Sequence, residues 1–413
     1  MKVLLVSQYY PPETGGPPNR ALSLARGLAL RGHEVTVVAE KPSHPEGVIY
    51  PGYGGLGIQV SKDDGVRVLH TWVWASPDKR PHVRILNHLS FMISGLVASS
   101  RAGSADVVLV TSPPLFAAVT GLVAARTRKA ALVLDIRDLW PELAISLGQL
   151  NSKPLRAAAR WLERGLYRSA DAVTAVTERF CAEIRGHTGA TTPVVLVRNG
   201  TVPEQFAAAD QREQLRAEQG CQDRFVVAYV GNIGLAQGLD HLIDAAEVLA
   251  GSNASVEFWL VGTGPARPGL EQSAVERGLT NVRFLDRADQ QRAAQLMNAA
   301  DALVVSLLPG PTLEKFVPSK LYDGLASRPP VLLGVAGEAA EILHASGGGL
   351  PYEQGNGAAL AAVISELQGD PQRAQEMGSA GADYARANLA RAVQAERMAE
   401  LLEALAEGRI RPE

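Results

Sequence analysis

The sequence predicts an α/β protein of two doubly wound domains, each a mainly parallel sheet with helices on both faces. Short apolar runs typical of buried parallel strands alternate with helical segments along most of the chain. The order strand, glycine-containing loop, helix occurs near residue 3 and again near residue 225. With 413 residues, 46% of them hydrophobic, the chain is long enough for two such cores.

Composition and charge exclude several classes of protein. The formal net charge is −3 and the pI is near 6.3, which argues against nucleic-acid binding because that needs a concentrated basic surface. Cys181 and Cys221 lie far apart in sequence and fit reduced thiols better than a disulfide or a metal site. His187 and most other histidines lack metal-ligand spacing, so we expect no metal. No apolar run is long enough for a signal peptide or a bilayer span, and we expect a cytoplasmic protein.

The first domain begins with a predicted strand over residues 3–6, a loop and a helix that ends near residue 30. The loop contains Gly15 and Gly16 and follows the carboxyl end of a strand, where open α/β sheets bind ligands. Glycines let the backbone approach an anion closely, although the prolines that follow remove N–H donors. A tight turn that simply requires glycine remains the alternative.

The next segments combine a long loop with an apolar helix. Residues 42–62 are rich in glycine and proline and are predicted as a loop, and residues 66–70 as a strand. An apolar helix follows through residues 85–97. Its aromatic and cationic neighbours are Trp72, Trp74, Arg80, Arg84 and Arg101. We favour a helix of the domain core over the alternative, an interfacial patch for a lipid-linked acceptor and for peripheral membrane contact.

Two further buried strands are predicted over residues 106–110 and 131–135, and the second is followed by Arg137 and Asp138. A charged pair where a parallel strand ends is well placed to contact a ligand, with Trp140 as a rigid support. The alternative is a salt-bridge cluster that only ends the strand.

The domain boundary is predicted near residue 203. After strands over residues 172–176 and 194–197 comes a turn-rich break, and then a charged helix over residues 210–219. We predict one domain over residues 1–203 together with a final helix over about residues 389–413, and a second domain over residues 204–388.

The second domain opens with a strand over residues 225–230 and a loop that contains Gly231, Asn232, Gly234 and Gln237. The loop is not the fingerprint of nicotinamide dinucleotide binding, because no third glycine follows in register and no acid ends the next strand. Further strands are predicted in this domain over residues 256–261, 281–285, 302–306 and 331–334.

Residues 316–327, FVPSKLYDGLAS, form the segment around which we organise the candidate site. A helix that begins near Pro318 offers unpaired N–H groups and a partial positive charge, to which Lys320 adds a full charge. Asp323 adds a carboxylate one turn later. Together they can hold a phosphate and a sugar diol; the alternative is a surface helix with a Lys320–Asp323 ion pair.

This segment resembles the nucleotide-sugar helix of retaining GT-B glycosyltransferases of family 4, in particular the WbuB-like bacterial surface-polysaccharide branch, and the resemblance covers nearly the whole chain. It extends to Gly-Gly-Pro at residues 15–17 and Arg-Asp-Leu-Trp-Pro at residues 137–141. The chain departs from the family where most relatives carry two glutamates eight positions apart, because Lys315 and Asp323 stand there. Asn232 and Gln237 stand where many relatives carry an arginine and a lysine.

The resemblance implies two Rossmann-like domains that face each other across a cleft. It implies metal-independent transfer of a hexosyl group from a nucleotide diphosphate sugar, with uridine as the base, to a hydroxyl of a glycan or polyprenyl-linked acceptor at the inner face of the membrane. The nucleotide sugar is a co-substrate, and no cofactor is expected. The implied catalytic residues are Arg137, Asp138 and Lys320. The implied donor-binding residues are Gly15, Gly16, Gly231, Asn232, Gly234, Gln237, Leu285, Ser319, Lys320, Leu321, Asp323 and Glu338.

Other functions fit the same sequence. A GT-B-like epimerase would act on the same nucleotide sugar without an acceptor. A nucleotide-sugar-binding subunit without activity would explain the absent acid and the absent arginine and lysine. A nicotinamide dehydrogenase is the third alternative.

Overall fold

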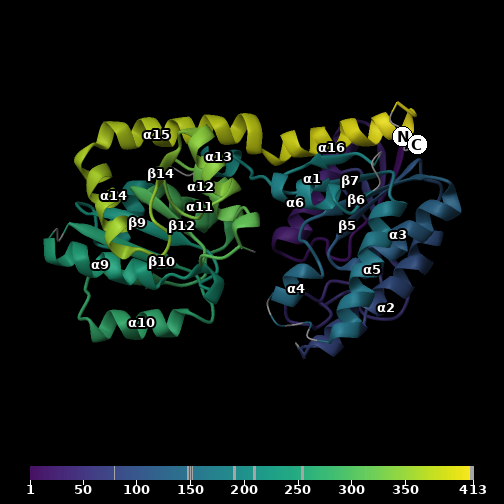
Figure 1. Ribbon diagram of the computed structural model, residues 1–413, viewed down its shortest axis with the longest axis horizontal. Coiled ribbons are helices and arrows are strands. Elements are labelled where there is room, and N and C mark those ends of the chain that lie inside the picture. The colour runs from purple at the N-terminus through teal and green to yellow at the C-terminus, as the bar shows by residue number, and fades with distance from the viewer. Residues whose placement is uncertain are drawn as a thin grey trace. The chain divides into compact units, whose positions relative to one another are not determined.

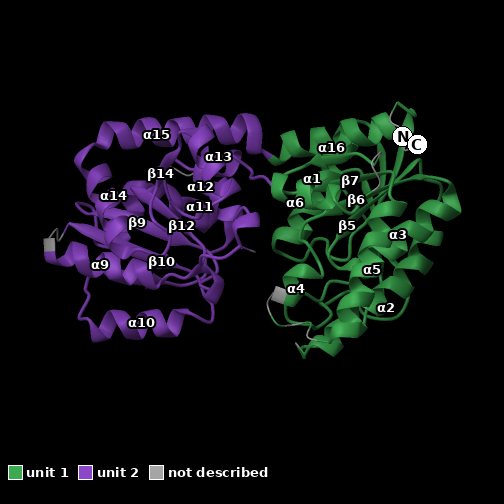
Figure 2. Ribbon diagram, in the orientation of Figure 1, with its two compact units in different colours: residues 1–199, 391–413 green, residues 200–390 purple. Residues whose placement is uncertain are grey.

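The computed structural model describes residues 1–78, 80–146, 148, 150, 152–188, 192–207, 211–252, 255–311 and 313–409. The chain divides into two compact units (Figure 2). Unit 1 contains Met1–Asn199 and Arg391–Glu413, and unit 2 contains Gly200–Ala390. The boundary predicted from the sequence was residue 203, and residue 210, where the charged helix was predicted to begin, lies outside the described residues.

The sheet of unit 1 has eight strands in the order β3-β4-β2-β1-β5-β6-β7-β8 (Figure 1). Its strands are β1 (Lys2–Val6), β2 (Glu34–Glu40), β3 (Gln59–Asp63), β4 (Val66–Thr71), β5 (Val107–Ser112), β6 (Ala131–Ile136), β7 (Ala172–Ala175) and β8 (Val194–Leu196). Only β3, paired with β4, is antiparallel among these strands. Without β3 and β8, the order is that of a Rossmann sheet, 3-2-1-4-5-6.

Strand β3 corrects the prediction of an uninterrupted loop over residues 42–62. Its side chains are polar except for Val60 and are mostly exposed, so it lacks the apolar signal of a buried strand. Asp64 and Gly65 both have positive φ and join β3 to β4 as a two-residue turn. The Asp-Gly pair is the signal that could have predicted this hairpin.

The helices of unit 1 include one from the far end of the chain. They are α1 (Gly16–Leu30), α2 (Pro81–Ser100), α3 (Leu115–Arg128), α4 (Glu142–Ser146), α5 (Lys153–Ser169), α6 (Glu178–Arg185) and α16 (Arg391–Ala406). Helix α16 packs against α1 so closely that a Cβ on Gly27 would collide with the side chain of Ala395. Leu24, Met398 and Leu402 are buried in the same core cluster.

Unit 2 has a six-stranded sheet in the order β11-β10-β9-β12-β13-β14, with every pairing parallel (Figure 1). Its strands are β9 (Phe225–Val230), β10 (Val256–Val261), β11 (Val282–Leu285), β12 (Ala302–Ser306), β13 (Val331–Gly334) and β14 (Gly349–Pro351). This is again the Rossmann order, with the switch point between β9 and β12. The predicted fold class, two Rossmann-like α/β domains, is confirmed, and β14 is an addition to the predicted strands.

The helices of unit 2 include the organising segment. They are α7 (Glu204–Ala207), α8 (Arg212–Glu218), α9 (Asp240–Ser252), α10 (Arg267–Glu276), α11 (Gln290–Ala299), α12 (Ser319–Ala326), α13 (Glu338–Ser346), α14 (Gly357–Gly369) and α15 (Pro371–Tyr384), with short turns at Leu235–Gln237, Leu313–Lys315 and Ala385–Leu389. Across the described parts of both units, none of the helices combines the length and the apolar character that crossing a bilayer requires.

Candidate functional site

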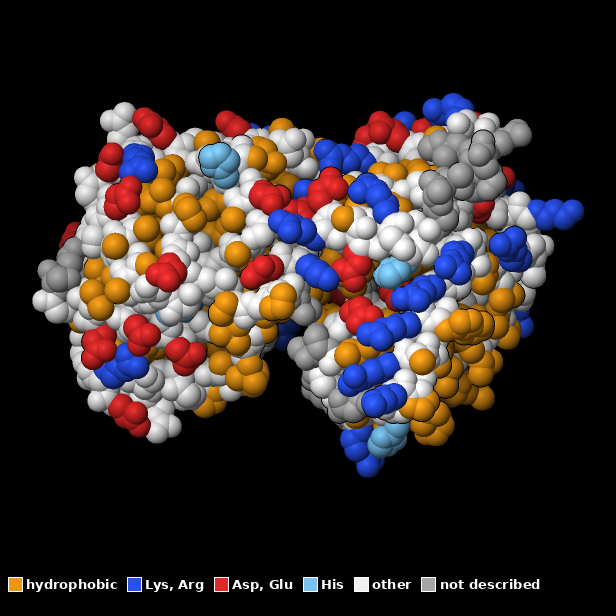
Figure 3. All heavy atoms as spheres, viewed as in Figure 1, with side chains coloured by type: hydrophobic (Ala, Val, Ile, Leu, Met, Phe, Trp, Pro, Cys, Tyr) orange, Lys and Arg blue, Asp and Glu red, His pale blue; other side chains and the backbone are white. Residues whose placement is uncertain are grey.

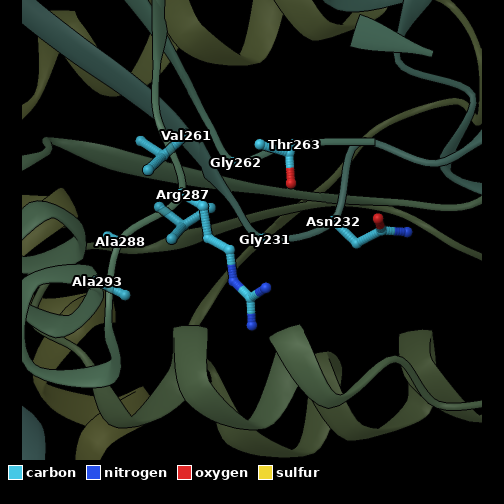
Figure 4. Close-up of a pocket in the computed structure, with 9 residues that line it drawn as sticks. Gly231, Asn232, Val261, Gly262, Thr263, Arg287, Ala288 and Ala293 are labelled. Carbon is cyan, nitrogen blue, oxygen red and sulfur yellow. The ribbon is translucent and has the colours of Figure 1, made fainter. Parts of the chain in front are cut away.

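A cavity of about 370 Å³ lies at the carboxyl ends of β9 and β10 in unit 2 (Figure 4). We call it the unit 2 cavity. It is lined by Val230, Gly231, Asn232, Val261, Gly262, Thr263, Arg287, Ala288 and Ala293. Two of the predicted donor-binding residues, Gly231 and Asn232, are among them.

Glycine backbone forms one side of the unit 2 cavity. Gly231, Gly262 and Gly264 all have φ between 137° and 157°, a conformation that favours glycine. A Cβ on Gly262 would collide with the carbonyl oxygen of Gly231, and a Cβ on Gly264 would collide with that of Ile233. The loops after β9 and β10 therefore touch through backbone, and glycine is required for both packing and conformation.

Lys320 reaches this glycine loop from the first turn of α12. Its Cε occupies the space that a Cβ of Gly231 would fill, and its Nζ lies 3.0 Å from the same point. Nζ also lies 5.4 Å from the ring centroid of Tyr229, a cation–π contact. Burial lowers the pKa of Lys320, while the nearby charge of Asp323 opposes that shift. The structure thus brings together Gly231 and Lys320, which are 89 positions apart in sequence.

Asp323 has a partner within unit 2. The hydroxyl of Thr201 donates a hydrogen bond of 2.6 Å to its Oδ1, and the N–H of Thr201 donates to the carbonyl of Leu389. Helix α12 is not the surface helix of the alternative interpretation, because Leu321, Tyr322 and Leu325 are fully buried. The carboxylate therefore connects a largely buried helix to the first residues of unit 2.

Two predicted donor-binding residues, Leu321 and Glu338, are buried and do not line the unit 2 cavity. The side chain of Leu321 lies in the core. The backbone N–H of Leu321 donates to the carbonyl of Pro318, the residue with extended backbone that precedes the helix. Leu321 shares the apolar face of its helix with Leu325, and this face, rather than a ligand, determines its position. Glu338 is buried in the first turn of α13 and does not line the unit 2 cavity.

Four further predicted donor-binding residues do not line the unit 2 cavity: Gly234, Gln237, Leu285 and Ser319. The carbonyl of Leu285 accepts hydrogen bonds from the N–H of Gly262 and from Arg267. The side chains of Asn232 and Gln237 lie against Gly234, where a Cβ would meet both. Ser319 is exposed at the start of α12.

Sequence reasoning missed Arg287, which lines the unit 2 cavity, whereas Lys320 lies against Gly231 and is not among the lining residues. It is exposed and follows β11 by two residues. In Figure 4 its guanidinium lies apart from the other side chains drawn. A cation just beyond the carboxyl end of a parallel strand is the signal that could have identified it.

A second cavity of about 250 Å³ lies at the carboxyl ends of β1, β5 and β6 in unit 1, and we call it the unit 1 cavity. Its lining residues are Tyr9, Pro17, Ile85, His88, Pro113, Pro114, Leu115, Phe116, Arg137, Asp138 and Trp140. The structure therefore brings Arg137 and Asp138 into one mainly apolar cavity. Gly15 and Gly16 do not line it; Gly15, at φ 124°, precedes α1.

Burial sets the electrostatics of this charged pair. Arg137 is nearly inaccessible and donates from Nη2 to the carbonyl of Pro113, while its Nε has no partner in the described part of the chain. Burial raises the pKa of Asp138, and the charge of Arg137 opposes the shift. Between these two described side chains no direct ion pair forms, and the charge of Arg137 acts on Asp138 without one.

Two Rossmann-like units, each with a cavity at the carboxyl ends of its strands, define the GT-B class of glycosyltransferases. A family model described as glycosyl transferase 4-like domain matches residues 15–200, and one described as glycosyl transferases group 1 matches residues 224–370. The chain belongs to the GT-B glycosyltransferases that combine these two domains, as the sequence predicted.

Individual relatives agree with this assignment. The Escherichia coli K12 protein WcaI, named as a glycosyl transferase of colanic acid biosynthesis, is 27% identical over 79% of this chain and 81% of its own. The sucrose-phosphate synthase of Thermosynechococcus elongatus has a similar structure, with a TM-score of 0.74 and 19% identity over 98% of this chain and 99% of that one. Anabaena HepE, solved with UDP, has a TM-score of 0.72 and 19% identity over 98% of this chain and 100% of that one.

Proposed function

We propose that this glycosyltransferase moves a hexosyl group, with retention of configuration, from a UDP-sugar to a hydroxyl of a glycan or lipid-linked precursor of a surface polysaccharide. The observation that carries the proposal is the position of Lys320, which packs on Gly231 where the strands of unit 2 end. HepE, a structural neighbour, has been solved with UDP and with UDP-glucose, and WcaI is named for polysaccharide biosynthesis.

In this proposal the unit 2 cavity holds the donor. The backbone of the glycine loop and the N-terminus of α12 supply N–H groups to the diphosphate, and Lys320 supplies a charge. Arg287 adds a second cation at the cavity. Two cations and a helix terminus can stabilise the departing diphosphate in place of a metal ion, which is why we propose metal-independent transfer without a cofactor.

The unit 1 cavity would hold the acceptor, with Arg137 and Asp138 orienting its reacting hydroxyl. Its apolar lining suits a ligand that has hydroxyl groups and an apolar surface. The membership of the WbuB-like branch, the sugar and the nucleotide remain predictions.

The proposal is tested by following a panel of nucleotide sugars with the protein by proton nuclear magnetic resonance. A thermal-shift screen first selects the donor, because a ligand at about a hundred times its dissociation constant stabilises the fold by about 2.7 kcal/mol. We expect release of UDP to depend on an acceptor and the new linkage to keep the anomeric configuration of the donor. Isomerisation of the donor alone would identify an epimerase, and tight binding with no turnover would identify a binding subunit.

Asp323 would accept hydrogen bonds from the ribose hydroxyls of the donor. Asp323→Ala is therefore expected to weaken the binding of UDP, because a hydrogen bond to a charged group contributes about 1.5–3 kcal/mol. Isothermal titration calorimetry measures the change. Thr201→Val is the matched control, since it removes the internal partner of Asp323 and keeps the carboxylate. Equal UDP affinity in wild type and Asp323→Ala would remove Asp323 from the ribose site.

We also propose that unit 1 contacts the cytoplasmic face of the membrane. The helix predicted for the core, α2, buries Phe91 but exposes Ile93 to 62%, and Ile85, Leu86 and Val97 are exposed as well. On α5, Arg160, Arg164 and Arg168 recur every four residues, and Trp161 between them is 77% exposed. Figure 3 shows a row of Lys and Arg side chains on unit 1 beside hydrophobic ones. Cations with an exposed tryptophan suit an anionic bilayer surface.

Flotation with vesicles tests this contact. We expect binding to vesicles of phosphatidylcholine with phosphatidylglycerol, and none to phosphatidylcholine alone. The double variant Arg164→Gln/Arg168→Gln is expected to lower the partition coefficient about thirtyfold, since each cation near an anionic surface contributes about 1 kcal/mol. Arg373→Gln/Arg386→Gln on unit 2 is the charge-matched control. A wild-type protein that stays entirely in solution would contradict the proposal.

A further inference from the structure

His88, on α2, lines the unit 1 cavity, and one of its two ring nitrogens forms a hydrogen bond with the segment that follows β1. Its Nδ1 lies 3.0 Å from Oε1 of Gln8, which follows β1. Which of the two atoms donates decides what His88 can offer to a ligand, because a neutral imidazole has one donor and one acceptor.

The neighbours of Gln8 fix the orientation of its amide. Its Nε2 donates to Oε2 of Glu40 at 2.6 Å and to Oδ1 of Asn87 at 2.7 Å. The amide of Asn87 is fixed in turn, because its Nδ2 donates to the carbonyl of Trp74. With both N–H groups of Gln8 used, its Oε1 faces His88, and an amide oxygen can only accept.

His88 must therefore donate from Nδ1, which leaves a lone pair on Nε2. Burial and the charge of Arg84 lower the pKa of His88 to about 4, so the ring is neutral near pH 7. Nε2 has no hydrogen-bond partner among the described residues. Two other charged residues, Arg137 and Asp138, line the cavity, and Glu40 accepts a hydrogen bond from Gln8. The ring is thus held as an acceptor in a mainly apolar cavity that also contains Arg137 and Asp138.

We propose that Nε2 of His88 accepts a hydrogen bond from a hydroxyl of a sugar ring bound in the unit 1 cavity. The proposal rests on the proposed function, which places the acceptor there, and it names the chemistry that recognises that acceptor. Tyr9, Phe116 and Trp140 line the same cavity and can pack against the C–H face of such a ring. Because its pKa is low, the His88 ring would orient the hydroxyl without removing its proton.

The tautomer is tested without any ligand. In the full chain labelled with ¹⁵N-histidine, two-bond correlation spectra at pH 7 should show His88 neutral and protonated on Nδ1. His88→Asn assigns the signal. The exposed His82 on the same helix is the control, with no fixed tautomer expected. A protonated ring, or a ring protonated on Nε2, would overturn the proposal.

Binding is tested with n-octyl β-D-glucopyranoside, which has sugar hydroxyls and an apolar tail, below its micellar concentration. We expect saturable binding that shifts the Nε2 resonance of His88, and His88→Ala should weaken binding roughly three- to tenfold. His88→Gln, which can still accept a hydrogen bond, should keep part of the affinity, and His82→Ala should keep all of it. Thermal melting confirms that each variant is folded.

Titration with UDP separates the two proposals. If wild-type protein binds UDP but not the glucoside, or binds the glucoside equally well with alanine at position 88, the inference about His88 fails and the proposed function stands. If UDP and UDP-sugars do not bind at all, the proposed function fails, whatever the tautomer of His88.

Discussion

Lys320→Ala is expected to lower the turnover number by about thirty- to a thousandfold, which corresponds to a loss of roughly 2–4 kcal/mol in transition-state stabilisation. Negative charge grows on the diphosphate as the bond to the sugar breaks, so a cation beside it acts more strongly on the transition state than on bound donor. Lys320 is the cation that the fold holds against the glycine loop. Lys320→Gln, which keeps length and removes charge, should be nearly as impaired.

The experiment needs saturating donor and single-turnover conditions, so that the measured rate is that of the chemical step. Arg287→Ala is the comparison, because Arg287 is exposed and should affect donor affinity more than turnover. The dependence of activity on pH provides a second test of the role of Lys320. Burial lowers the pKa of Lys320 in the free protein, so kcat/KM, which reports the free enzyme, should fall as pH rises, at a lower pH than for an ordinary lysine. Wild-type turnover in Lys320→Ala would mean that the backbone N–H groups and Arg287 hold the diphosphate without Lys320.

Arg20→Ala is expected to destabilise unit 1 by about 3–5 kcal/mol, because it leaves a buried carboxylate without its counter-charge. Arg20 on α1 and Asp135 on β6 are 3% and 0% exposed and form a bidentate pair at 2.8 and 2.6 Å. Arg20 also donates to the carbonyls of Val197 and Arg198, and Thr174 donates to Asp135. One guanidinium thus joins a helix to β6 and to the segment after β8, and Asp135 extends the network to β7.

Urea unfolding of the variant and of wild type measures this difference. Arg26→Ala, which breaks a pair with Asp63 that is 40% and 38% exposed, is the control and should cost at most about 1 kcal/mol. A loss in Arg20→Ala no larger than that of the control would show that the buried pair contributes no more than a surface one.

The fold could be predicted because buried parallel strands are nearly continuous apolar runs, as in residues 107–110 and 256–261. Strand β3 could not be recognised in this way, since a polar edge strand has no buried face. Its only local signal is the turn at Asp64 and Gly65. Within these limits, mainly parallel sheets follow from the α/β alternation, whereas strand order and edge strands depend on pairing that the local sequence hardly encodes.

The candidate site was less predictable. Lys320 was found from its own chemistry at a helix start, but its contact with Gly231 depends on which strands are neighbours. Arg287 was missed although Leu285, at the end of the same strand, had been assigned to the donor site; β11 is third from the switch point, and its end opens on the same cavity. His88 lies in an apolar helix 80 positions from Gln8, and only the fold brings the two side chains together.

The packing of α16 on α1 has a consequence for synthesis of the chain. Leu24 and Leu28 of α1 share a buried cluster with Met398, Leu402 and Leu405 of α16. This part of the core of unit 1 can therefore form only after all of unit 2 has been synthesised. Domains usually fold in order from the N-terminus as the chain leaves the ribosome. Here unit 2 can complete its fold before unit 1 does. Until α16 has been made, the apolar face of α1 remains exposed on the nascent chain and is accessible to chaperones.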